Sequence, residues 1–326
     1  VSPRHVVVGG AAGAALANLL LLAADGPELG IGLRFLTGLF LAGVYPPSLK
    51  LLSTWYRRGR GLALGILVGA LTLGSAVPHL INGLGGLDVT TTIVATSVLT
   101  LGGGAIVAAF VHEGPFPFPK ATFDPRQAGV VFRNRGTRLA SLGYFGHMWE
   151  LYALWAWFFV FFSDTASVGD RAAALATFAV IGIGALGCSA GGYLGDRWGR
   201  TRTTAAAMAA SGACALTIGL LSEAPPALLL AVGLLWGFTV VADSAQFSTI
   251  VTEIADQSYV GTALTLQLAL GFTLTVATIW LIPVLEEAVT WRWAFALLAP
   301  GPALGVVAML RLRSLPEARA IAGGRG

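Results

Sequence analysis

Apolar runs of about 20 residues recur along the whole chain, and short polar connectors separate them. An α-helix needs about that length to cross the hydrocarbon core of a bilayer. The runs are continuous and lack the strict alternation of barrel strands, so they predict helices. We expect about ten spans, at residues 5–24, 29–54, 61–84, 90–112, 139–162, 170–194, 203–222, 226–250, 260–284 and 291–312.

The composition excludes a water-soluble domain. Hydrophobic residues make up 56% of the chain and charged residues only 11%, whereas about 25% of a soluble domain is charged. The chain is therefore expected to be an all-α polytopic membrane protein whose main partner is the lipid bilayer. Cys188 and Cys214 both lie inside apolar runs and have no spacing typical of a disulfide or metal site. We expect no metal and no cofactor.

The distribution of charge over the connectors predicts the orientation of the chain. When the connectors are assigned to alternating sides, one side receives almost all of the 20 Lys and Arg residues, and the other only Arg171 and Arg292. Basic connectors stay on the cytoplasmic side, so both ends of the chain are expected in the cytoplasm. The basic residues are scattered over several short loops and form no stripe, which argues against nucleic-acid binding.

One connector is longer than the rest and divides the chain. Residues 113–138 contain four prolines, at positions 115, 117, 119 and 125, and fall on the basic side. Such a segment is typical of a linker between two bundles. It predicts a partial N-terminal bundle over residues 1–112 and a six-helix bundle with a short tail over residues 139–326.

A motif between two predicted spans carries a resemblance to a known family. The segment from Gly191 to Arg202 reads GGYLGDRWGRTR. It resembles the cytoplasmic loop signature of the Major Facilitator Superfamily, G-x-L-x-D-R-x-G-R-R/K. The resemblance implies two six-helix bundles that rock about a midplane site, and a loop that latches the bundles together in one state. The alternative is that these arginines only set the topology. The motif residues are Gly192, Gly195, Asp196, Arg197, Gly199 and Arg200.

A second observation concerns the start of the chain. Residues 1–5 (VSPRH) resemble the end of a first copy of the motif, and the segments at 61–64 (GLAL) and 261–264 (GTAL) are about 200 residues apart. Parallel six-helix repeats produce such an offset. We expect the chain to correspond to helices three to twelve of the family; the alternative is a natural ten-helix protein. The segment 144–157 resembles uncharacterised bacterial members grouped with nitrate/nitrite porters, although the arginine of those porters is missing from the eighth helix.

Ionisable residues within the spans are candidates for function, because such groups are costly in a membrane. Glu150 lies near the middle of its span, and His147 is one turn before it on the same face. The resemblance implies that this helix and the one carrying Asp243 both line a central aqueous chamber. We predict that Glu150, His147 and Asp243 couple transport to protons. The alternatives are a structural Glu150–His147 pair and an Asp243 bonded to neighbouring helix residues.

Other polar and aromatic residues are predicted to line a substrate cavity. Arg34 would favour an anionic substrate if it faced that cavity, but it could instead reach the outer interface. The alternative is efflux of a lipophilic compound, which the aromatic lining favours. The remaining candidates are Tyr45, Thr72, His79, Asn82, Tyr152, Trp236, Gln246 and Gln267.

These features favour a secondary active transporter of a small solute, driven by protons. A membrane-embedded enzyme or a non-transporting receptor is the alternative; an enzyme would need a nucleophile, a metal cluster or a His/Asp set near one membrane face, and a receptor would normally add a soluble output domain. All basic residues except Lys50 and Lys120 are arginine, which suits a GC-rich bacterium and its inner membrane. We expect a monomer.

Overall fold

The computed structural model describes residues 2–118, 129 and 132–326. The elements that it describes are helices, and they cluster into two compact units. Unit 1 comprises Val1–Arg57 and Gly86–Phe118, and unit 2 comprises Arg58–Gly85 and Pro119–Gly326.

Unit 1 is built around its first helix, which packs against the other three. Its elements are α1 (Pro3–Leu19), the 3-10 turn η1 (Leu20–Ala23), α2 (Pro27–Ala42), α3 (Tyr45–Ser53) and α5 (Val89–Phe110). The predicted span 29–54 divides at Gly43 and Val44 into α2 and α3. Two prolines follow Tyr45, in the first turn of α3, where a missing N–H costs nothing.

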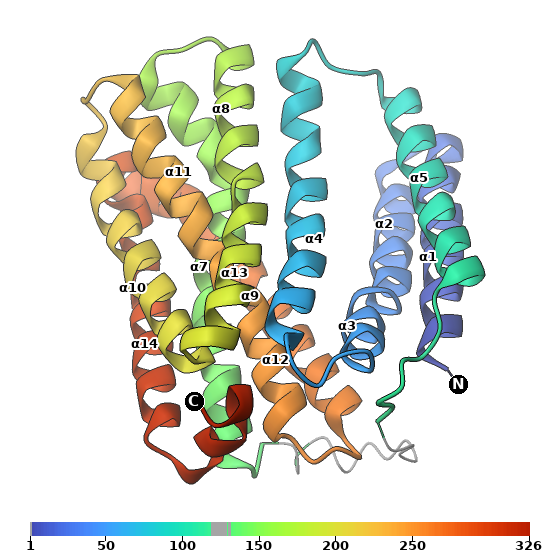
Figure 1. Cartoon of the computed structure of the whole chain (residues 1–326). Helices are drawn as coiled ribbons and strands as arrows, with labels where there is room; N and C mark the ends of the chain where they lie inside the picture. Colours follow the sequence, from blue (N-terminus) through green and yellow to red (C-terminus); the bar gives the residue numbers. More distant parts are fainter. Residues whose placement is uncertain (1, 119–128, 130–131) are drawn as a thin grey trace. The chain divides into compact units, whose positions relative to one another are not determined.

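Unit 2 contains the remaining helices, which Figure 1 shows in the colours of the sequence. Helix α7 packs against α13 and α14, and α10 packs against α9, α11 and α14. Helix α4 belongs to this unit and packs against α8 and α9. The elements are α4 (Arg60–Gly83), α7 (Arg135–Ala166), α8 (Asp170–Gly182), α9 (Gly184–Trp198), α10 (Arg200–Ile218), η3 (Gly219–Leu221), α11 (Pro226–Ala242), α12 (Ser244–Ile254), α13 (Val260–Ala294), η4 (Phe295–Leu298), α14 (Pro300–Arg313) and η5 (Pro316–Gly323).

Close contacts between backbones hold α9 against α11. A Cβ added to Gly187 would lie 2.9 Å from the carbonyl carbon of Phe238, and one added to Gly191 would lie 2.8 Å from that of Ala242. Glycine is therefore required at both positions for this approach. Small residues at helix contacts are the usual means of packing in lipid, where no hydrophobic force drives helices together.

The helices agree with the predicted spans over most of the chain. Within the described residues, eight segments are long and apolar enough to cross a membrane. The count differs from about ten for two reasons. Residues 260–313 form one 54-residue segment, although Thr290 breaks its helix with φ 61° and ψ 171°. Helix α7 is not among the eight, although its 32 residues contain the predicted span 139–162. The prediction of an all-α polytopic membrane fold is confirmed.

Candidate functional site

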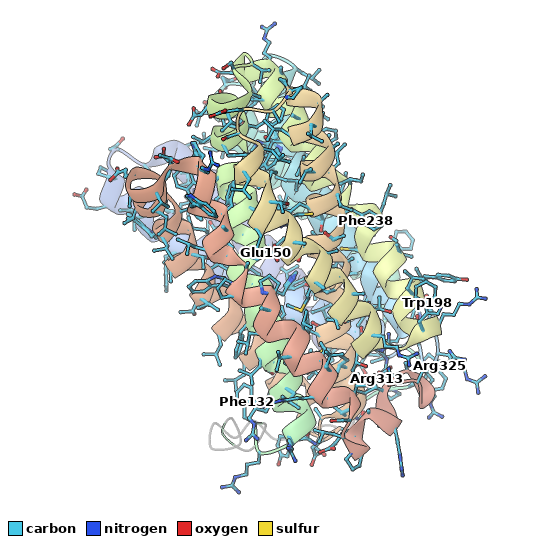
Figure 2. The ribbon with its side chains drawn as sticks, turned by 90° about the vertical axis from the view of Figure 1, so that its left-hand side faces the viewer. Phe132, Glu150, Trp198, Phe238, Arg313 and Arg325 are labelled. Carbon is cyan, nitrogen blue, oxygen red and sulfur yellow. The ribbon has the colours of Figure 1, made fainter. Side chains whose placement is uncertain are left out.

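Glu150 is buried at mid-length in α7 and is bonded by two neutral donors. The residue is only 1% exposed to solvent. The indole Nε1 of Trp236 on α11 donates to Oε1 at 2.7 Å, and the hydroxyl of Ser211 on α10 donates to Oε2 at 2.9 Å. Figure 2 shows Glu150 midway along the helices of unit 2. The carboxyl group is therefore held by three helices and has no cationic partner within ion-pair distance among the described residues.

His147 and Asp243 form a second buried pair one turn away. The His147 Nδ1 and Asp243 Oδ1 atoms lie 2.8 Å apart, and both residues are buried. Asp243 lies at the junction where α11 ends and α12 begins, with φ −87° and ψ −20°. The rings of Tyr144 and Phe247 flank the imidazole, with centroids 6.0 and 5.7 Å away. His147 thus approaches Asp243, whereas the sequence had suggested a pair with Glu150.

The surroundings of both carboxyl groups differ from those expected. The family resemblance implied that Glu150 and Asp243 face a water-filled chamber, but in this conformation both are buried within unit 2. We name the five residues that bind or pair around these groups the buried acid cluster: His147, Glu150, Ser211, Trp236 and Asp243. Among them, Ser211 was not a sequence candidate; its place on α10, level with Glu150, depends on helix packing that no local pattern reveals.

The other cavity candidates of unit 2 are dispersed. Thr72 is buried and donates to the carbonyl of Val68 on its own helix. Gln267 Nε2 lies 3.4 Å from the hydroxyl of Ser141, and Gln246 belongs to the charged cluster described below. At the half-buried Tyr152, the ring lies against those of Trp155 and Phe272. His79 stacks on Phe159, and Asn82 is exposed.

In unit 1, Arg34 ends a polar network that joins three helices. Arg34 Nη1 on α2 donates to Asn18 Oδ1 on α1 at 3.1 Å. The Asn18 amide in turn donates to α5, at Ile93 O, Thr96 Oγ1 and Ser97 Oγ. Arg34 is exposed and has no carboxylate within ion-pair distance among the described residues. Tyr45, the remaining candidate, is half-buried at the start of α3.

The loop motif joins α9 to the first turn of α4. Asp196 accepts hydrogen bonds from the backbone N–H of Gly61 at 3.1 Å and of Leu62 at 2.9 Å. It therefore caps the N-terminus of α4, where a negative charge is favourable. Arg200 Nη2 lies 2.8 Å from Asp196 Oδ1.

Arg200 is the centre of this charged cluster and is only 2% exposed. It makes a bidentate pair with Glu253 at the end of α12, with distances of 2.9 and 2.8 Å. Its Nη1 donates to Gln246 Oε1 at 3.2 Å. Glu253 was not a candidate from the sequence, although an acid in the connector between the predicted spans 226–250 and 260–284, on the basic side, was an available signal. We call Asp196, Arg200, Gln246 and Glu253 the loop cluster.

The other motif residues shape the loop. Gly192 packs against the backbone of Gly61, and Gly195 against the side chain of Gln246. Gly199 separates α9 from α10 with φ +100°, a value that L side chains rarely adopt. Arg197 is exposed and donates to the hydroxyl of Tyr193 at 2.8 Å.

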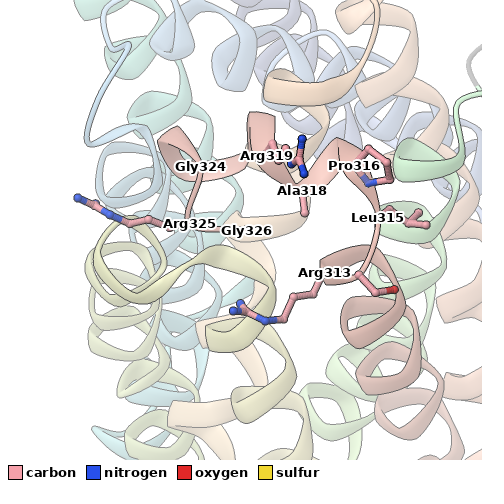
Figure 3. Close-up of a pocket in the computed structure, with 9 residues that line it drawn as sticks. Arg313, Leu315, Pro316, Ala318, Arg319, Gly324, Arg325 and Gly326 are labelled. Carbon is pink, nitrogen blue, oxygen red and sulfur yellow. The ribbon is translucent and has the colours of Figure 1, made fainter.

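The C-terminal segment covers part of the loop cluster. The Ala322 N–H donates to Glu253 Oε2, and Arg325 Nη1 donates to the carbonyl of Asp196 at 2.6 Å. Beside these contacts is a pocket of about 370 Å³ (Figure 3), lined by Arg313, Ser314, Leu315, Pro316, Ala318, Arg319, Gly324, Arg325 and Gly326. Figure 2 places Arg313 and Arg325 toward one end of the unit, away from Glu150. Among the described residues no group of three or more His, Cys, Asp or Glu could hold a metal.

Two transporters of known structure have a fold similar to that of this chain. The human organic anion transporter MFSD10 (TETRAN) matches with a TM-score of 0.78 at 15% identity, over 94% of this chain and 77% of that one. A variant of the E. coli fucose:proton symporter FucP matches with a TM-score of 0.70 at 15% identity, over 97% of this chain and 85% of that one. Identities this low show the fold alone. A search of curated proteins finds no match.

The family follows from the sequence profile that matches the chain. The profile described as Major Facilitator Superfamily matches residues 1–279, which is well over half of the sequence. That region includes the loop motif and every member of the buried acid cluster. Together with the helical fold and its structural matches, this shows that the chain belongs to the Major Facilitator Superfamily.

Proposed function

We propose that this protein is a secondary active transporter that couples the movement of a small solute to protons, with Glu150 as the proton carrier. The observation that carries the proposal is the environment of Glu150: an ionisable group at mid-length in a membrane helix, bonded only by neutral donors. A charge costs a great deal in such surroundings, so a carboxyl group kept there is functional by default. Because no cation lies within ion-pair distance of Glu150 in the part of the chain that the structure describes, protonation is the available means of removing its charge.

Asp243 is less suited to release and uptake of a proton than Glu150. Its carboxyl group lies 2.8 Å from His147, which can share a proton with it. That pair can stay close to neutral as a whole while Glu150 titrates. We therefore assign His147 and Asp243 to tuning or relay. Since Glu150 is almost wholly buried here, its exchange with water requires the other conformations of an alternating-access cycle.

A small anion is the substrate class that the unit 1 network favours. Arg34 lies eight residues into a membrane helix, and its hydrogen-bond partner among the described residues is the neutral amide of Asn18. An arginine in that position offers several free N–H groups to a carboxylate or similar anion. The two structural neighbours are consistent with this class and with coupling: one is an organic anion transporter and the other a fucose:proton symporter.

We further propose a monomer in a bacterial inner membrane, with the connectors that carry the loop cluster in the cytoplasm, because the basic connectors lie on that side. In the family's alternating-access cycle, the loop cluster would act as the latch. We infer transport rather than covalent chemistry for the buried acid cluster.

The test is transport by the full-length protein reconstituted into liposomes with an imposed pH gradient. Radiolabelled organic anions and lipophilic compounds are supplied as candidate substrates, and the internal pH is followed with a trapped dye. We expect the gradient to drive accumulation of an anion, Glu150→Gln to abolish the pH response while binding persists, and Asp243→Asn to reduce it less. Arg34→Gln should weaken binding of anions only. Unchanged coupled transport by Glu150→Gln would refute the carrier assignment.

A further inference from the structure

The two oxygens of Glu150 face partners of different chemistry. The indole N–H of Trp236 is only a donor, whereas a serine hydroxyl is one donor and also an acceptor. We propose that, in the carrier role proposed above, the proton of Glu150 resides on Oε2, and that Ser211 reverses its hydrogen bond each time this proton binds or leaves.

The contact with Trp236 determines which oxygen remains an acceptor. Trp236 Nε1 lies 2.7 Å from Oε1, and its residue is fully buried. An indole cannot accept a proton, so Oε1 is the acceptor in both states of the carboxyl group. The neutral acid therefore gains most when Oε1 is its carbonyl oxygen, and Oε2 its hydroxyl oxygen.

The position of Ser211 allows both directions of the second bond. Its Oγ lies 2.9 Å from Glu150 Oε2 and 3.2 Å from the carbonyl oxygen of Met208, one turn earlier on α10. When Glu150 is charged, the hydroxyl donates to Oε2. When Glu150 is neutral, Oε2–H donates to Oγ, and the serine proton turns to Met208. Neither state leaves a buried polar group without a partner, which would otherwise cost stability.

The neighbouring titratable groups do not offer Oε2 another acceptor. Two such groups interact electrostatically with Glu150: Asp243, at the α11–α12 junction, and Cys214 on α10. Asp243 is engaged by His147 at 2.8 Å, and no hydrogen bond joins Cys214 to Glu150 among the described residues. Protonation can thus occur with little movement of heavy atoms, because Oε2 gains a proton and only the hydroxyl hydrogen of Ser211 changes direction. Ser211 is a positioning residue in this scheme.

Infrared difference spectroscopy of the full-length protein in lipid tests the assignment. A pH step isolates the C=O stretch of the protonated carboxyl group, and Glu150→Gln identifies the band by its loss. We expect Trp236→Phe to move the band to higher wavenumber, because the carbonyl oxygen loses its donor. Ser211→Ala should cause a smaller shift, and Ser211→Thr, which keeps the hydroxyl, should restore the original band. Thr217→Val removes an exposed hydroxyl from the same helix and should change nothing.

The titration midpoint of the band supplies a second criterion. Under the proposal Ser211 bonds both forms, so Ser211→Ala should move the midpoint by less than about one pH unit. A serine that served only the charged form would move it by about one to two units, the effect of one hydrogen bond to a charged group. A shift of that size would refute the reversal of the Ser211 hydrogen bond. A band that does not move in Trp236→Phe would refute the placement of the Glu150 proton on Oε2.

The same preparations separate this inference from the proposed function. If the band behaves as expected while Glu150→Gln protein still performs coupled transport, the proton position stands and the carrier role is refuted. If coupled transport requires Glu150 but the shifts in Trp236→Phe and Ser211→Ala are exchanged in size, the carrier role stands and the proton lies on Oε1. Thermal unfolding of each variant in the same lipid confirms that the compared proteins are folded.

Discussion

The contact between α9 and α11 predicts that Gly191→Ala will destabilise unit 2 and impair the buried acid cluster. The added Cβ would lie 2.8 Å from the carbonyl carbon of Ala242 and 3.2 Å from its Cα. These are backbone atoms, which cannot turn aside as the end of a flexible side chain can. The two helices must therefore separate, by enough to restore ordinary contacts of about 3.5–4 Å between carbon atoms.

The size of the effect follows from that displacement. Overpacking of this kind costs about 1–3 kcal/mol, and a gap of about 0.5–1 Å removes a quarter to a half of the dispersion energy of each contact along the interface. The higher helix propensity of alanine than of glycine offsets at most about 1 kcal/mol of this loss. The net loss is expected to be about 1–2 kcal/mol. Because Ala242 precedes Asp243, the shift also lengthens the 2.8 Å contact between His147 and Asp243.

Thermal unfolding followed by tryptophan fluorescence, in lipid and at a fixed heating rate, measures the loss. The matched control is Gly74→Ala on α4, where an added Cβ meets nothing within 4 Å. We expect the control to unfold at or slightly above the wild-type temperature, and Gly191→Ala several degrees below it with weaker proton-coupled transport. If Gly191→Ala unfolds no earlier than the control, the close approach of α9 and α11 is refuted.

Three further predictions concern charged residues. Asp196→Ala removes the cap of α4 and should lower the free energy of unfolding by about 0.5–2 kcal/mol. In a double-mutant cycle with Arg200→Gln, fully additive losses would contradict the pairing of Asp196 with Arg200. Glu253→Gln leaves the buried Arg200 without its bidentate partner and should cost about 2–3 kcal/mol, more than Asp196→Ala in the same unfolding assay. Hydrogen bonds from the hydroxyl and backbone N–H of Thr91 lower the pKa of Asp88, so the cap of α5 is complete above the ordinary pKa of an aspartate and is lost as pH falls through the lowered value. Asp88→Ala should therefore flatten the acid side of the stability curve of unit 1, and an unchanged curve would refute the cap.

The two clusters differ in what they require of a membrane protein. In the loop cluster, the carboxylates of Asp196 and Glu253 both lie against Arg200, so the buried charge of the guanidinium is compensated without any change of protonation. Within the described ranges Glu150 has no opposite charge beside it, and it is stabilised by two neutral donors. A buried carboxyl group without an opposite charge becomes neutral only by binding a proton. This difference from Arg200 underlies the different roles that we propose for the two clusters.

The amino-acid sequence alone determined the membrane class, the helical spans and the family, because each depends on local properties. Hydropathy over about 20 residues reports the cost of exposing a segment to lipid, and the loop motif from Gly191 to Arg202 is contiguous. The same local reading identified Glu150, His147 and Asp243 as unusual, since an ionisable residue in an apolar run is visible without coordinates.

The partners of those residues were decided only by the tertiary structure. Helical spacing placed His147 beside Glu150, but the packing of α11 and α12 against α7 brings Asp243 to His147 instead. Ser211 and Trp236 reach Glu150 from sequence distances of 61 and 86 residues, and Glu253 reaches Arg200 from 53 residues away. Hydrogen bonds between helices depend on their rotation and axial register, and these are set by the summed packing of many side chains rather than by any local pattern.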